Sequence, residues 1–169
     1  MAATPPKLLA LDTNVVLDLA EGLDAAHDFR ETFTDRGYGL RLPPTAAVEL
    51  RWKSVNDPRS AVRTLATRAL AQLRAWDIQP LPELGGVEYA VAERFVVRLR
   101  LSGLLPDQEI NDGFILGETS LARIAVLVTS DHHLLDMEET ALRIVFQESD
   151  LPLVAPVHPS RLLKAARRS

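Results

Sequence analysis

The stretch "LLALDTNVV" (residues 8–16) ends a run of apolar residues in a carboxylate, Asp12, which Thr13 and Asn14 follow. A second stretch, "VLVTSDHHLL" (residues 126–135), does the same at Asp131. Each apolar run has the length of a buried strand. In an open parallel sheet the ligand crevice lies outside the carboxyl ends of the strands, so we expect Asp12 and Asp131 to be neighbours at one edge.

Apolar periodicity, glycines and prolines divide the rest of the chain into further elements. Alternating strands and helices predict an α/β sandwich around a mainly parallel sheet, because parallel neighbours need crossover helices. The two long helices in the middle are expected to form an inserted pair over about residues 55–102. Expected strands cover 7–11, 40–42, 125–129, 142–146 and 153–154, and expected helices cover 14–21, 25–35, a segment opened by Pro43 and Pro44, 61–76, 87–101, 107–124 with Asp107 as N-cap, and 161–168.

The composition limits the class of protein. A length of 169 residues with 47% hydrophobic side chains suits one domain over residues 1–169. No segment approaches the roughly 20 apolar residues of a membrane helix, and the first residues lack the pattern of a signal peptide, so we expect a cytoplasmic protein with no membrane partner. Cysteine is absent, and any metal must therefore bind to oxygen or imidazole.

The net charge of −4 argues against a protein that holds nucleic acid by bulk positive charge. The charge is unevenly distributed, since residues 51–100 carry nine basic and five acidic side chains, a local balance of +4. This segment is either a phosphate-binding surface beside an acidic site or a pair of helices with solvated arginine faces.

Two further acids complete a candidate site. Glu49 lies in the opening turns of its expected helix, and Asp112 shares a helix face with Ile115 and Thr119, which predicts an inward carboxylate. Two like charges about 4 Å apart cost on the order of 4 kcal/mol at an effective dielectric near 20. The motifs of the four acids offer no nearby Lys or Arg, so either protons or cations must neutralise them. Hard oxygen ligands favour Mg²⁺ or Mn²⁺, which suits phosphodiester hydrolysis by an activated water.

These motifs resemble those of the PIN domains, metal-dependent nucleases that include the toxins of VapBC toxin–antitoxin pairs. "LLALDTNVVLDL" is similar to the family's opening strand, with Asp12 as its first acid and Asn14 at the position that helps to orient it. "PPTAAVELRW" resembles the segment that carries the second acid, Glu49. "NDGFILGETSLARIAVLVTSDHHLL" resembles the third and fourth segments, with Asp112 and Asp131.

The resemblance implies a three-layer α/β/α sandwich and an endoribonuclease that hydrolyses RNA phosphodiesters with Mg²⁺ or Mn²⁺. It implies Asp12 and Asp112 as main metal ligands, completed by Glu49 and Asp131. It further implies an antitoxin protein as partner and a homodimer. Candidate substrate-binding residues are Asn14, Thr129, Ser130, Arg51 and Lys53. Glu118 stands where the family commonly has a small residue. It is either an extra site acid or a residue of the helix surface, and we expect it to support the site.

Alternatives stay open beside this interpretation. Each acid alone could be a helix cap or a surface residue. The fold could be a catalytically silent module that binds nucleic acid or protein. His132 and His133 lack the spacing of a zinc site, and Trp52 and Trp76 are expected in the core or at an interface.

Overall fold

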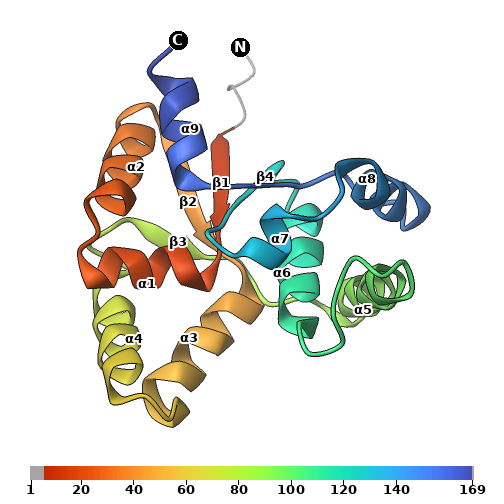
Figure 1. The fold of residues 1–169 in the computed structure, drawn as a ribbon, viewed down its shortest axis with the longest axis horizontal. Coiled ribbons are helices and arrows are strands. Elements are labelled where there is room, and N and C mark those ends of the chain that lie inside the picture. The colour runs from red at the N-terminus through yellow and green to blue at the C-terminus, as the bar shows by residue number, and fades with distance from the viewer. Residues whose placement is uncertain (1–5, 169) are drawn as a thin grey trace.

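A computed structural model describes residues 6–168 of the chain as an α/β sandwich (Figure 1). Its strands and helices alternate as the sequence predicts, with exceptions given below. The elements are β1 (Lys7–Leu11), α1 (Thr13–Glu21), α2 (Asp24–Asp35), β2 (Tyr38–Leu42), α3 (Pro44–Asn56), α4 (Ser60–Gln72), β3 (Ile78–Pro80), α5 (Gly86–Leu101), α6 (Ile110–Leu121), β4 (Val126–Val128), α7 (His132–Leu135), α8 (Glu139–Glu148), β5 (Ala155–Val157) and α9 (Pro159–Ala166).

The five strands form one sheet in the order β3-β2-β1-β4-β5, and every pairing is parallel. Helices flank the sheet, with α2 on one side and α5, α6 and α8 on the other, which confirms the predicted sandwich. The central strand β1 is buried over Leu9, Ala10 and Leu11, as expected for a strand covered on both faces. Its neighbours are β2 and β4, so the two strands that end in "DTN" and "TSD" lie side by side.

The strand predicted over residues 142–146 is wrong, because this segment lies inside helix α8. Its buried residues, Leu142, Val145 and Phe146, are spaced three and four apart, which is the period of a helix. Glu138 starts the helix by accepting hydrogen bonds from the backbone of Thr140 and Ala141. The short run of apolar residues is compatible with a strand as well as with this helical spacing, which is why the sequence predicted a strand. The last strand also lies slightly later than predicted, at 155–157.

Asp107 does not cap a helix. Helix α6 begins at Ile110, and Asp107 instead forms an exposed ion pair with Arg100, with 2.9 Å between Nη2 and Oδ1.

The middle of the chain was predicted to be an inserted pair of helices, but it also contributes a strand to the sheet. Strand β3 lies between α4 and α5 and pairs with β2 at the edge of the sheet. The connection "IQPLPELGG" therefore contributes to the sheet itself. Helix α4 packs against α1 and α3, and α5 packs against α6 and α8, so the two helices cover different parts of the molecule.

Two glycines on α6 allow α5 to pack closely against it. A Cβ atom at Gly113 would meet Val96 Cγ2 at 3.0 Å and Leu105 Cδ2 at 2.9 Å, and one at Gly117 would meet Phe95 Cδ1 at 3.3 Å. These contacts fix the position of α6, which carries Asp112.

Candidate acidic site

The carboxyl ends of β1 and β4 bring the first and last motifs together. Leu11 is the partner of Val128 in the parallel ladder, so the residues that follow them, Asp12 and Thr129, are adjacent. The hydroxyl of Thr129 is fully buried and donates to Asp12 Oδ2 at 2.8 Å. The Thr129 hydroxyl oxygen in turn accepts the backbone N–H of Asp131 at 3.0 Å. Thr129 thus joins the two acids, and its hydroxyl is committed to holding them in place.

Asp12 is 3% exposed and caps helix α1, where its Oδ1 accepts the N–H of Thr13 at 2.7 Å. Burial raises the pKa of Asp12 to about 6. Hydrogen bonds from Thr129 and Thr13 oppose this rise, and repulsion from Glu49 and Asp131 adds to it. Asp12 therefore lies within electrostatic range of two of the other predicted acids.

Asp112 points inward, as the helix periodicity predicts, and is 8% exposed. Its Oδ2 is buried and has no hydrogen-bond partner among residues 6–168. Burial raises the pKa of Asp112 to about 8, and repulsion from the following four acids adds to the rise: Asp12, Asp131, Glu109 and Glu49. A buried carboxylate oxygen without a partner is unusual in a folded protein and calls for a proton or a cation.

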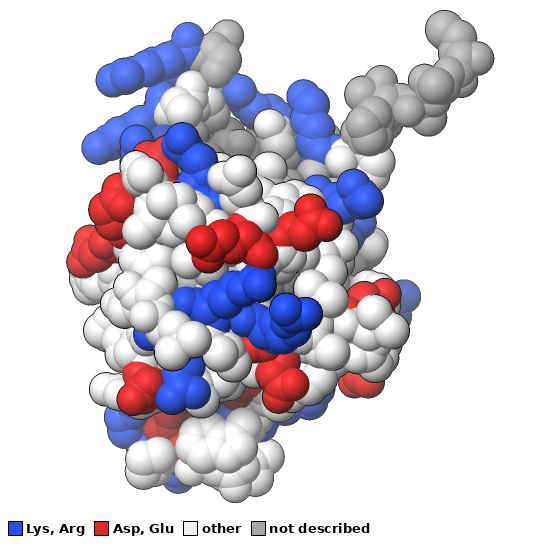
Figure 2. All heavy atoms as spheres, turned by 90° about the vertical axis from the view of Figure 1, so that its right-hand side faces the viewer, with Lys and Arg blue, Asp and Glu red and all other residues white. Residues whose placement is uncertain are grey.

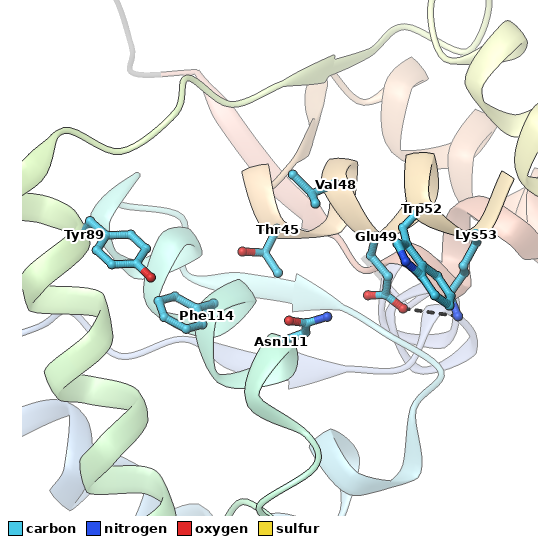
Figure 3. Close-up of a pocket in the computed structure, with 8 residues that line it drawn as sticks. All are labelled: Thr45, Val48, Glu49, Trp52, Lys53, Tyr89, Asn111 and Phe114. Atoms are coloured by element: carbon cyan, nitrogen blue, oxygen red, sulfur yellow. Dashed lines mark ion pairs between the residues drawn. The ribbon is translucent and has the colours of Figure 1, made fainter. Parts of the chain in front are cut away.

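Glu49 is half-buried on α3 and faces the same cluster. Its Oε2 accepts a hydrogen bond from the hydroxyl of Thr13 at 3.1 Å. Its Oε1 lies 3.4 Å from Nζ of Lys53, one helical turn further on (Figure 3). The expectation that no Lys or Arg lies near the acids is therefore wrong for Glu49, because the i,i+4 spacing of a helix brings Lys53 to it.

Asp131 caps the short helix α7 by accepting the N–H of His133 at 2.7 Å. The neighbouring Ser130 donates to Asp18 at 3.4 Å, so Asp18 turns toward the β4 end rather than into solvent. His133 is mostly exposed and lies 4.0 Å from Glu109. Neither histidine contacts the buried acids in the described part of the chain.

The structure thus brings all four predicted acids into one electrostatic cluster, which we call the acidic cluster: Asp12, Glu49, Asp112 and Asp131. Sequence reasoning missed Glu109, which borders the cluster, and Thr13, which orients Glu49. Thr13 follows Asp12 directly in the "DTN" motif, and that adjacency was the available signal.

The cluster matches Mg²⁺ or Mn²⁺ in its donor chemistry. Carboxylate oxygens are the ligands that these ions prefer, and the unpartnered Asp112 Oδ2 and the two raised pKa values are what an anionic site without its cation produces. Within residues 6–168, however, no three Asp, Glu or His side chains are arranged so that they could hold a metal ion as they stand.

Glu118 lies outside the acidic cluster and connects two of its helices. It is 5% exposed on α6 and accepts the N–H of Thr45 at 3.0 Å and the Thr45 hydroxyl at 2.6 Å. The residue that precedes α3, Pro43, makes no side-chain cap. Glu118, on another helix, therefore accepts a backbone N–H of the first turn of α3 that has no acceptor within its own helix. It thereby fixes α3, with Glu49, against α6, with Asp112.

We expect Glu118→Ala to lower the free energy of unfolding by about 1–3 kcal/mol, because it leaves a polar group at the start of α3 without its partner. Chemical denaturation measures this change. Glu118→Gln, which keeps an acceptor oxygen, is the matched control and should retain most of the stability. Equal losses in both variants would mean that the carboxylate charge, rather than the hydrogen bonds, matters.

The remaining predicted substrate-binding residues, Asn14 and Arg51, lie on helices α1 and α3, which also carry residues of the acidic site. Asn14 is half-buried in the first turn of α1, with no side-chain hydrogen bond among the residues described, and Arg51 is exposed on α3.

Many arginines of the middle segment bind protein groups. Arg98, for example, donates to the backbone of Glu148 at the end of α8. Figure 2 shows the face that carries α5 and α8, where basic side chains lie together at the centre with acidic side chains above and below them. This face has no extended surface of one sign. Further arginines with protein partners are Arg59, Arg63, Arg68 and Arg100.

No helix in residues 6–168 is long and apolar enough to cross a membrane. No family model matches the sequence, and no curated protein matches it.

Solved structures share the fold at low sequence identity. The chain resembles VapBC2 from Rickettsia felis, solved bound to a DNA fragment from its promoter, with a TM-score of 0.61 and 13% identity over 89% of this chain and 98% of that one. It resembles FitAcB from Neisseria gonorrhoeae with a TM-score of 0.54 and 18% identity over 89% and 97%. For PAE2754 from Pyrobaculum aerophilum the TM-score is 0.53, with 16% identity over 99% and 100%. These likenesses show a common fold.

Proposed function

We propose that this protein is a Mg²⁺- or Mn²⁺-dependent endoribonuclease whose active site is the acidic cluster. The observation that carries the proposal is Asp112, a buried carboxyl with an unpartnered oxygen and a pKa of about 8, close to four further acids. A protein gains no stability from such an arrangement without a cation, and perturbed pKa values of this kind concentrate at functional sites.

The chain's own residues have distinct roles in this proposal. Asp12 and Asp112 supply the main ligands, and Asp131 and Glu49 complete the set. Thr129 holds Asp12 and the start of α7 in place, while Thr13 orients Glu49. When bound, the metal activates water and stabilises the charge that develops on the phosphate. In this proposal Lys53 and Arg51, both on α3, bind phosphates of the RNA backbone, Lys53 after release from Glu49.

We further propose that the protein acts as the toxin of a toxin–antitoxin pair. The similarity of its fold to VapBC2 supports this context, as does the motif resemblance to PIN domains. The partner would be an antitoxin protein.

The direct test is cleavage of a labelled single-stranded RNA by the purified protein with Mg²⁺, with Mn²⁺ and with EDTA. We expect cutting only with metal, and loss of cutting in Asp12→Asn. Asp24→Asn, which removes the same charge from an exposed position on α2, is the control and should cut normally. Cutting that persists in EDTA, or in Asp12→Asn, would contradict the proposal.

The second candidate is a catalytically silent module. The ion pair between Glu49 and Lys53 favours it, because this pair neutralises one acid without metal. Under this alternative the wild-type protein cuts no RNA with either metal. The cleavage assay therefore separates the two functions.

A further inference from the structure

A pocket of about 610 Å³ lies next to the acidic cluster, between α3, α5 and α6 (Figure 3). This volume is within the range of small-ligand sites. One face of α3 forms a wall, with residues spaced as on one side of a helix, and α5 and α6 supply the rest. The lining residues are Thr45, Val48, Glu49, Trp52, Lys53, Tyr89, Asn111 and Phe114.

The pocket combines aromatic rings with polar groups. Trp52 and Tyr89 are 52% and 51% exposed, unusually high for large aromatic side chains. Tyr89 and Phe114 stack with ring centroids 5.5 Å apart and an angle of 20° between their planes. The side chains of Asn111 and Thr45 lie beside these rings. A flat ligand with an aromatic face and a polar edge fits this lining, which is the chemistry of a nucleobase.

The pocket is continuous with the acidic cluster. Glu49 belongs to both, and Asn111 precedes Asp112 in the chain. Lys53 brings a positive charge to the same wall. A strand whose phosphate lies at the acids therefore has a neighbouring base within reach of the aromatic rings. The adjacency of an acidic cluster, a cation and stacking surfaces favours single-stranded nucleic acid over an apolar protein segment as the occupant.

We infer that this pocket binds one unpaired base of the RNA strand, next to the phosphodiester at the acidic cluster. The inference rests on the proposed function and deepens it, because it selects single-stranded over duplex RNA. Bases in a duplex are paired and stacked within the helix and cannot enter the pocket. Trp52, expected from the sequence in the core or at an interface, becomes a substrate-binding residue.

The test measures binding by fluorescence anisotropy of a labelled single-stranded ribo-octamer, with Ca²⁺ in place of Mg²⁺ so that the acids are neutralised, and a gel of the same samples checks that the octamer stays intact. Replacing an aromatic residue that stacks on one base costs roughly 1–3 kcal/mol, so we expect Trp52→Ala to bind roughly five- to 150-fold more weakly. Trp52→Phe, which keeps a ring, should bind nearly as the wild type does. The same sequence in a duplex should bind wild-type and Trp52→Ala proteins equally.

Intrinsic fluorescence gives a second measurement. Trp76 is 9% exposed, so quenching by the unlabelled octamer should come from Trp52 and disappear in Trp52→Phe. Equal octamer affinity of wild-type and Trp52→Ala proteins would overturn the inference. Sedimentation would then show whether the variant dissociates a dimer, which would make the pocket an interface between copies.

The outcomes separate this inference from the proposed function. Metal-dependent cutting with no effect of Trp52 on binding would leave the nuclease proposal intact and remove the base pocket. Binding that depends on Trp52 without any cutting would keep the pocket and remove the nuclease proposal.

Discussion

Asp112→Asn is expected to abolish RNA cleavage while making the metal-free protein more stable. Loss of residues that only orient a metal ligand costs 10–100-fold in metal affinity or activity, so we expect loss of a ligand to lower the cleavage rate by at least about 100-fold. The same change removes a buried carboxyl that is held protonated near pH 7 by burial and by repulsion from four other acids. One substitution should thus move activity and stability in opposite directions.

The expected gain in stability follows from the pKa of Asp112. Its pKa is about 8 in the folded protein, against 3.8 for an ordinary Asp. At neutral pH the carboxyl therefore ionises readily only in the unfolded chain, and this ionisation lowers the free energy of the unfolded state relative to the folded one. One pKa unit corresponds to 1.36 kcal/mol, so Asn should raise the free energy of unfolding near pH 7 on the order of 2–4 kcal/mol. For a chain of this size that raises the midpoint of thermal unfolding by roughly 5–10 °C.

Calorimetry in EDTA and the cleavage assay measure the two effects on the same protein samples. Asp107→Asn is the matched control, because Asp107 is exposed and close in the chain. It should change neither quantity appreciably. An Asp112→Asn protein that cuts RNA at the wild-type rate would remove Asp112 from the active site, and an unchanged melting temperature would mean that its carboxyl is not destabilising.

The second large effect is a dependence of stability on pH that a divalent metal reverses. Asp12 and Asp112 have pKa values of about 6 and about 8, both raised above 3.8. Between pH 3.8 and about pH 8 the folded protein therefore binds more protons than the unfolded chain does. The stability that this contributes is fully present below about pH 4 and is lost as the pH rises through 6 and 8.

We expect the free energy of unfolding in EDTA to fall on the order of 3–5 kcal/mol between about pH 5 and pH 8. Mn²⁺ or Mg²⁺ should restore stability at pH 8, by about 2.7 kcal/mol at 100 times its dissociation constant. Denaturant titrations at each pH provide the measurement, with NaCl at matched ionic strength as the control for screening. A stability that rises with pH in EDTA, or that NaCl restores as well as Mn²⁺ does, would contradict a cation site at the acidic cluster.

Most of the elements were predictable because their signals are local. Apolar runs defined β1 and β4, and Gly22 ended α1 as expected. The segment 142–146 failed because a short apolar run fits either a strand or a buried helix, and only packing against the rest of the core distinguishes them. Asp107 failed as a cap because α6 begins only at Ile110, with Glu109 at the position before it, and Asp107 pairs with Arg100 instead.

Those features of the candidate site that depend on local patterns were predictable, and those that depend on contacts between helices were not. The spacing of Asp112 from Ile115 and Thr119 predicted its inward direction, and the strand ends predicted the approach of the β1 and β4 motifs. The contacts of Glu118 with Thr45 and of Lys53 with Glu49 decide whether a carboxylate is free, and each depends on how the helices are placed.

By itself, the sequence determined where the acids lie in their elements, because strand ends and helix faces are set by residues a few positions apart. Only the tertiary structure decided how strongly the four acids repel one another, that Asp112 Oδ2 lacks a partner and that Trp52 lines a pocket. These properties depend on desolvation and on charges from segments as distant as Asp12 and Asp131. Burial and repulsion act between residues that are close in space but far apart in the chain, so patterns over a few neighbouring residues do not reveal them.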